Sequence, residues 1–240
     1  MIVTWVAGAC VIAVASFVLG LAGFGIGLVA LAFLPFLMAP HTAIVLLTVY
    51  TVVFSTALFV PLRAHFVATG MGALLIGSVV GTPLGVWVLA TLPGSTLNRM
   101  IGGVLVIVVL LEWLGLYPAR LHGRGWALGA GLAAGVLGGA VGTPGPPVIL
   151  YTASQGWSPR TIKANLQAFF VVNQAVILAG YWWAGLLTVE VAHFALIFIV
   201  PAVVGLALGM ALFTRVDAVR FRKIVFTLLF ASGLVLLVRG

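Results

Sequence analysis

Residues 135–147 read Gly-Val-Leu-Gly-Gly-Ala-Val-Gly-Thr-Pro-Gly-Pro-Pro, a helix-breaking run inside an apolar segment long enough to cross a membrane. In hydrocarbon every backbone N–H and C=O needs a partner within the protein, so a broken helix is tolerated only where it is buried or lines a cavity. Glycine also lets helices pack closely, which is the simpler explanation. For residues 138–147 we favour a broken backbone that lines a substrate site.

The composition of the 240-residue chain is that of an integral membrane protein. Hydrophobic residues make up 64% of it, charged residues 6%, and the mean hydropathy is +1.34. Soluble domains are far less apolar. We predict an all-α polytopic membrane protein with about eight transmembrane helices, at residues 4–35, 42–61, 66–92, 100–118, 126–152, 164–186, 189–213 and 221–238. The first and fifth segments exceed one crossing, which leaves room for a broken or re-entrant helix in each.

Two glycine patterns recur and indicate two homologous halves. The pattern around Gly81 and Gly85 returns 124 residues later around Gly205 and Gly209, and the four-residue spacing favours close helix packing. The spacing Gly-x-x-Gly-x-x-x-Gly that begins at Gly20 returns 115 residues later. We predict repeats at 1–118 and 124–240 within one integral membrane domain, with the extra residues of the second repeat in the loop 154–160. Such duplication is common in secondary transporters, and the repeats are either parallel or inverted.

The glycine-rich segments are expected to start short helices inside the membrane. Proline suits the first turn of a helix, so Pro146, after Gly142 and Gly145, favours a helix start there. In the first half, Gly23, Gly25 and Gly27 are expected to set up a matching helix that starts after Gly27. Free N–H groups and the positive dipole end at each start favour an anion. Two such ends would together hold one oxyanion.

Polar side chains near these segments are the next candidates. Thr143 lies inside the break and is the best hydroxyl candidate for ligand contact. Amides within the sixth span should face a partner or a cavity: Asn165, Asn173 and Gln174. In the second span Thr48 and Thr51 share a helical face with Ser55. Hydrogen bonding between or within helices is the alternative for each of these residues.

Charged residues are too few for most other functions. Arg63 and Lys163 lie near span ends, where they either snorkel to the interface or guide an anion to the cavity. The net charge of +8 is scattered, so no nucleic-acid partner is expected. HExxH, CxxC, GxSxG and Walker motifs are missing from the sequence, and Cys10 is its single cysteine. We therefore predict a protein that is not an enzyme and has no cofactor and no metal site.

The glycine-rich run resembles a known family. Residues 135–151, followed by Lys163-Ala164-Asn165 and preceded by the related glycines of residues 20–27, are similar to the sulfite exporter TauE/SafE family of bacterial membrane permeases. The resemblance covers nearly the whole chain, and its Gly-Thr-x-Gly-Pro-Pro motif at 142–147 is fairly specific. It implies a multi-pass protein of the bacterial inner membrane that transports sulfite, organosulfonate or related anions.

The function expected is therefore a secondary transporter in which half-helix N-termini hold the anion near the midplane and the halves rock to alternate access. An anion channel and a non-transporting membrane scaffold are the alternatives. The expected partners are a small anionic substrate and the lipid bilayer, with a coupling proton or sodium ion and a homodimer left open. Import of an anion would require such coupling, whereas export can proceed without it because the cell interior is negative.

Overall fold

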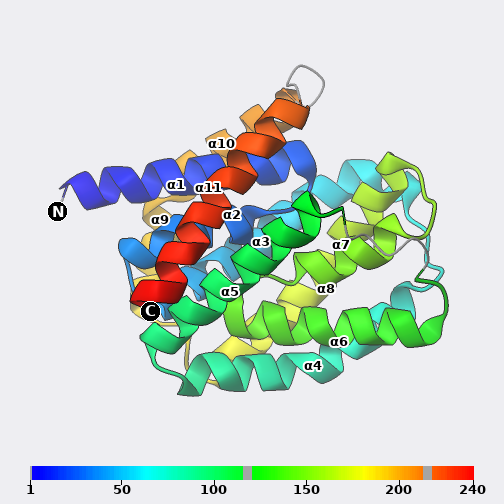
Figure 1. The fold of residues 1–240 in the computed structure, drawn as a ribbon, viewed down its shortest axis with the longest axis horizontal. Helices are drawn as coiled ribbons and strands as arrows, with labels where there is room; N and C mark the ends of the chain where they lie inside the picture. Colours follow the sequence, from blue (N-terminus) through cyan, green and yellow to red (C-terminus); the bar gives the residue numbers. More distant parts are fainter. Residues whose placement is uncertain (1, 116–120, 213–217) are drawn as a thin grey trace. The chain divides into compact units, whose positions relative to one another are not determined.

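The computed structural model describes residues 2–115, 121–212 and 218–240, and within these ranges the regular structure is entirely helical (Figure 1). The elements are α1 (Ile2–Ala22), α2 (Ile26–Phe33), η1 (Leu34–Phe36), α3 (Pro40–Leu62), η2 (Arg63–His65), α4 (Met71–Thr91), α5 (Gly94–Trp113), α6 (Arg124–Val141), α7 (Gly145–Ala153), α8 (Pro159–Trp183), α9 (Val189–Ile197), α10 (Ile199–Ala211) and α11 (Ala218–Arg239). The predicted all-α class is confirmed.

Several helices are long and apolar enough to cross a membrane. Five pass by themselves in the described chain, namely Thr4–Ala22, Pro40–His65, Met71–Thr91, Gly94–Trp113 and Pro159–Trp183. The pair α9 and α10, bent by 52° at Phe198, gives a sixth if it forms one span. The chain is thus a multi-pass membrane protein, and the predicted count of eight stays a prediction.

The first and fifth predicted spans are broken where their glycines lie. α1 ends at Ala22 and α2 begins at Ile26, while α6 ends at Val141 and α7 begins at Gly145. Gly23 and Gly142 follow the two long helices with left-handed φ angles of 81° and 64°, which glycine adopts without steric cost. The broken helices predicted from the glycine and proline pattern are therefore confirmed.

The elements follow the same order twice: a long helix, a break, a short helix, and further long helices. Three pairs of matching positions are each separated by 119 residues: the helix ends Ala22 and Val141, the left-handed Gly23 and Gly142, and the helix starts Pro40 and Pro159. The offset of 115 proposed for the glycine pattern is therefore wrong by four residues, about one helical turn. Since the offset is 119 on both sides of it, the loop 154–160 holds no extra residues.

The helices gather into two compact units that draw on both predicted repeats. Unit 1 contains α1, α2, η1, α3 up to Leu47, α5, α9, α10 and α11. Unit 2 contains α3 from Thr48 onward, η2, α4, α6, α7 and α8. The compact units therefore do not coincide with the repeats predicted at 1–118 and 124–240. Homology of the two halves stays a prediction.

Glycine faces hold the main helix pair of unit 2 together. α4 and α6 lie side by side (Figure 1), and a Cβ on Gly77, Gly81 or Gly85 would overlap a backbone oxygen of α6. In the reverse direction, a Cβ on Gly131 or Gly135 would overlap a backbone oxygen of α4. The predicted role of these α4 glycines in close packing is confirmed.

The corresponding helix pair of unit 1 is α1 with α10. A Cβ on Gly205 or Gly209 would overlap the Ala13 or Phe17 carbonyl oxygen of α1, as predicted from their spacing. In unit 2, Gly81 and Gly85 meet the carbonyl oxygens of Leu132 and Val136 in the same way, and those residues lie 119 positions after Ala13 and Phe17. The two pairs thus share one packing register.

Candidate functional site

The candidate site is the break between α6 and α7 in unit 2. The N–H groups of Gly142 and Thr143 donate to the carbonyls of Gly138 and Leu137 at 3.0 and 3.3 Å, which closes the end of α6. α7 then starts at Gly145, with Pro144 as its N-cap residue. Gly142 is the turning point, because its left-handed conformation would cost another residue about 1–2 kcal/mol.

The N-terminus of α7 offers few backbone donors. The first N–H groups of a helix have no intrahelical acceptor and favour an anion. Pro146 and Pro147 carry no N–H, so Gly145 is the one donor among the first three residues of α7. An anion at this end must be held largely by side chains, a task that the sequence analysis assigned mainly to backbone N–H groups.

Two buried side chains at the break carry polar atoms without partners. The Thr143 hydroxyl, in a residue that is 4% exposed, has no hydrogen-bond partner in the described part of the chain. The same is true of Asn173 Nδ2, in a residue that is 1% exposed, although Asn173 Oδ1 accepts a hydrogen bond from Ser78 Oγ. An unsatisfied buried polar group costs about 1–3 kcal/mol, so such a pair is typical of a site that binds a ligand.

Asn173 of α8 lies close to the start of α7. A Cβ built on Gly138 would lie 3.5 Å from Asn173 Nδ2 and 3.0 Å from Pro144 Cβ. Pro144 follows Thr143 directly, so the partnerless amide and the partnerless hydroxyl belong to one region of unit 2. Glycine at position 138 leaves room for Ile177 Cδ1, which would lie only 2.7 Å from a Cβ there.

Tyr181 ties α8 to the end of α6. Its buried hydroxyl donates to the Gly139 carbonyl at 2.7 Å and to the Gly138 carbonyl at 3.3 Å, and the side chain of Thr48 on α3 lies near it. The last four carbonyls of a helix lack intrahelical partners, so Tyr181 satisfies one end of the break. The sequence pattern does not predict this role, because nothing local to Tyr181 points to an acceptor more than 40 residues away.

We expect Tyr181→Phe to destabilise the protein by about 1–3 kcal/mol, because it leaves a buried carbonyl without its donor. Thermal unfolding of the purified protein in detergent measures this. Thr48→Val is the matched control: it changes a buried side chain near the Tyr181 hydroxyl, keeps both carbonyl bonds, and should cost less. An unchanged unfolding midpoint for Tyr181→Phe would contradict a role in holding the break.

Helices α3 and α8 carry matching buried polar residues. On α3 these are Thr48 and Ser55, and on α8 they are Gln167 and Gln174, each pair seven residues apart and none more than 2% exposed. Seven residues are about two turns, so each pair shares a helical face. Thr51 is buried on α3 as well. Ser55 Oγ and Gln174 Oε1 have no partner in the described ranges, so polar groups without partners continue beyond the break.

The break of the first repeat lies in unit 1 and has a different chemistry. Gly25, with φ 96°, is the N-cap residue of α2, which starts at Ile26. Gly27 is therefore inside the helix, and the expected helix start after Gly27 is wrong. The first three residues of α2 all carry an N–H, unlike the two prolines of α7. At the positions 119 residues before Thr143 and Asn173, however, the chain has Phe24 and Phe54.

Three further predicted residues lie elsewhere in unit 2. Asn165 pairs with the backbone of Val67: its Oδ1 accepts from the N–H at 2.9 Å and its Nδ2 donates to the C=O at 3.1 Å. It thus anchors the chain after η2 to α8, and we leave it out of the proposed site. Arg63 is exposed in η2, and Lys163 is half-buried in the second turn of α8.

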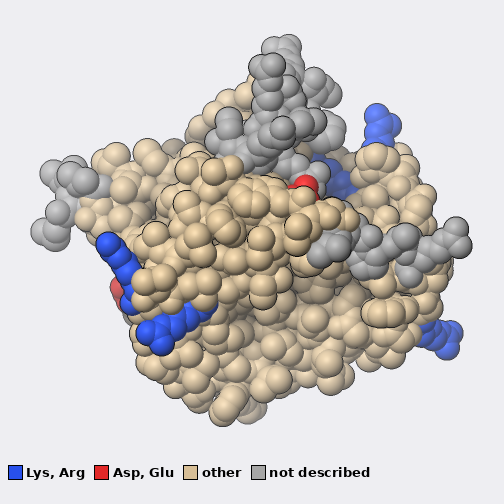
Figure 2. All heavy atoms as spheres, viewed as in Figure 1, with Lys and Arg blue, Asp and Glu red and all other residues tan. Residues whose placement is uncertain are grey.

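The interior described by the structure contains no buried cation. Among the side chains that the structure places, Arg63, Arg99, Arg124, Arg160 and Arg239 are exposed and Lys163 is half-buried. Figure 2 shows one face of the molecule, on which Lys and Arg form a few separate groups on a largely uncharged surface. An anion bound in the described interior would be held by neutral groups.

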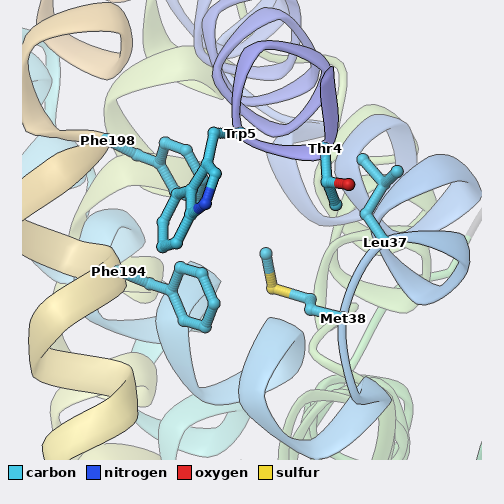
Figure 3. Close-up of a pocket in the computed structure, with 6 residues that line it drawn as sticks. All are labelled: Thr4, Trp5, Leu37, Met38, Phe194 and Phe198. Atoms are coloured by element: carbon cyan, nitrogen blue, oxygen red, sulfur yellow. The ribbon is translucent and has the colours of Figure 1, made fainter. Parts of the chain in front are cut away.

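Unit 1 also contains a cavity of about 180 Å³, lined by six residues (Figure 3): Thr4, Trp5, Leu37, Met38, Phe194 and Phe198. Trp5 packs on Phe194 with ring centroids 5.3 Å apart, and Phe194 stacks on Phe198 at 5.8 Å. The Thr4 hydroxyl and the indole N–H of Trp5 are the only polar side-chain groups of this lining. The other four lining residues are apolar.

Comparison with known proteins identifies the family of this chain. The family model of the sulfite exporter TauE/SafE matches residues 8–236. The chain is 26% identical over 217 residues to a protein of Cupriavidus necator named "Probable sulfite/organosulfonate exporter TauE". The matched region covers 88% of this chain and 85% of that protein. No solved structure gives a significant match. Because the family model covers nearly all of its length, the chain belongs to the sulfite exporter TauE/SafE family.

Proposed function

We propose that this protein is a secondary transporter that exports small anions of the sulfite or organosulfonate type across the bacterial inner membrane. Membership of the TauE/SafE family and the name of the Cupriavidus necator relative support this class of substrate. The multi-pass helical structure supports a function within the membrane.

The observation that carries the proposal is the pair of partnerless polar groups at the α6–α7 break. The Thr143 hydroxyl and Asn173 Nδ2 are both donors, both are buried, and both belong to the region where α7 begins. Together with the Gly145 N–H and the positive dipole end of α7 they would hold one anionic head group. Gln174, also buried, extends this polar region along α8.

Export follows from electrostatics without a coupling ion. Moving one negative charge out of a cell with a negative interior is favoured by about 2.3 kcal/mol per 100 mV. We propose alternating access around the broken helices, in which the site opens to one side of the membrane at a time. The bend of 52° between α9 and α10 is a second place where a helix can change direction during this movement.

Thr143→Val tests the site directly. A partnerless hydroxyl replaced by a methyl group of the same shape should leave stability unchanged or slightly raised. Loss of one hydrogen bond to a charged ligand, about 1.5–3 kcal/mol, should weaken anion binding by roughly tenfold or more. Calorimetric titration and thermal unfolding of the same preparation measure both quantities. Equal loss of stability and binding would indicate a purely structural role.

Flux in proteoliposomes tests the function. Labelled sulfite, isethionate and acetate are compared with and without a proton gradient, against protein-free liposomes. We expect saturable movement of sulfite and isethionate that needs no proton gradient, and weaker movement of acetate. If none of the three moves faster than in protein-free liposomes, the proposed function is wrong.

A further inference from the structure

We infer that the site at the α6–α7 break selects monovalent anions, so that the bound form of sulfite is hydrogensulfite and not the dianion. This inference rests on the proposed function, because it names the charge state of the proposed substrate. It follows from the neutrality of the donors at the break and from the location of the described cations.

The donors at the break are all neutral. They are the Thr143 hydroxyl and Asn173 Nδ2, which are buried and have no partner within the described ranges, and the Gly145 N–H at the start of α7. Ser78, which donates to Asn173 Oδ1 from α4, is also neutral. A helix end adds roughly half a unit of positive charge. Such a site balances one negative charge far better than two.

The helices packed against the break bring no cation close to it. α6 and α8 contact α7, and α4 packs on both α6 and α8. The titratable residues of these four helices are Arg124, Tyr151, Arg160, Lys163 and Tyr181. Both arginines are exposed at helix starts, and the tyrosine hydroxyls are neutral near pH 7. Lys163 lies ten residues before Asn173, which is about 15 Å along α8.

Desolvation makes the difference between one and two charges large. The Born cost of transferring an ion out of water grows with the square of its charge, so a dianion loses about four times the hydration energy of a monoanion of equal size. With no buried cation among the side chains that the structure describes, hydrogen bonds from neutral groups do not offset this difference. Hydrogensulfite and organosulfonates without a second acidic group carry one charge, whereas sulfite above its second pKa and sulfate carry two.

Binding to the full-length protein in detergent, measured by calorimetry between pH 6 and pH 9, tests the inference with three anions. Isethionate is a permanent monoanion, sulfate is a dianion throughout this range, and sulfite changes from one to two charges near neutrality. Each pH unit above the sulfite pKa lowers its monoanion fraction by about tenfold. We expect the apparent affinity for sulfite to fall by the same factor, that for isethionate to stay constant, and sulfate to bind at least about a hundredfold more weakly.

The outcomes separate the inference from the proposed function. Isethionate binding combined with sulfate binding of similar strength, or with sulfite affinity that is constant or rises with pH, would overturn monoanion selection and leave the transporter proposal intact. No binding of isethionate or sulfite at any pH would overturn both.

Lys163→Gln serves as the control for a titrating protein group. If the pH dependence belongs to the ligand, this variant keeps the fall in sulfite affinity and the constant isethionate affinity. If the fall disappears in Lys163→Gln, the dependence belongs to the lysine and the inference is wrong. Thr143→Val should weaken isethionate binding by roughly tenfold at every pH, which locates the site at the break.

Discussion

The double variant Thr143→Val/Asn173→Leu should lose anion transport by about a thousandfold while the protein stays folded. Each substitution removes one partnerless donor from the α6–α7 break. A hydrogen bond to a charged ligand contributes about 1.5–3 kcal/mol, and two such losses give roughly two to four orders of magnitude in affinity. Initial rates of labelled isethionate flux in proteoliposomes, with protein content and orientation matched, measure the effect.

Ser78→Ala is the matched control for this variant. It removes the Ser78–Asn173 hydrogen bond, as Asn173→Leu does, but it keeps Asn173 Nδ2 as a donor. Transport by Ser78→Ala should therefore stay within about tenfold of the natural protein, since one neutral hydrogen bond contributes roughly 0.5–1.5 kcal/mol. If Ser78→Ala and the double variant lose transport equally, the helix contact and not the free donors explains the loss.

Gly135→Ala should prevent correct packing of α4 on α6. A Cβ at this position would overlap the Ser78 carbonyl oxygen and lie 2.9 Å from the Thr82 nitrogen. Both are backbone atoms within α4, so the helices can relieve the overlap only by separating. Overpacking of this kind costs about 1–3 kcal/mol and sometimes more. Thermal unfolding in detergent, with the yield of monodisperse protein on size exclusion, measures the loss.

Gly129→Ala on the same helix controls for the change in composition. A Cβ at Gly129 would meet no atom within 4 Å, so this variant should be as stable as the natural protein. A substitution at a cap glycine such as Gly142 is no suitable control, because an alanine in its left-handed backbone conformation would add strain of its own. Equal stability of Gly135→Ala and Gly129→Ala would contradict the close α4–α6 contact.

The sequence carried enough information to locate both helix breaks. Glycine and proline act on the backbone locally, so Gly142 and Pro146 mark a break wherever the surrounding helices lie. The packing role of Gly81 and Gly205 was also predictable, because each has a second glycine four residues later, on the same face of its own helix. The family resemblance followed from the same residues.

Pairing between distant residues was less accessible. Asn165 and Asn173 look alike in sequence, yet Asn165 is paired with the Val67 backbone while Asn173 keeps a free donor at the break. Only the position of α3, α4 and α6 around α8 separates these two roles. The difference between the predicted offset of 115 and the observed offset of 119 has a similar origin. Regularly spaced glycines align almost as well when one copy of the pattern is moved by four residues, about one helical turn.

Counterflow is the most direct test of transport by this protein. Proteoliposomes are loaded with unlabelled isethionate, diluted into a trace of labelled isethionate, and compared with unloaded proteoliposomes. A carrier that binds the anion at one site and alternates its access predicts faster entry and transient accumulation of label in the loaded vesicles. Equal rates of label entry into loaded and unloaded proteoliposomes, or single-channel currents in a planar bilayer, would contradict this account.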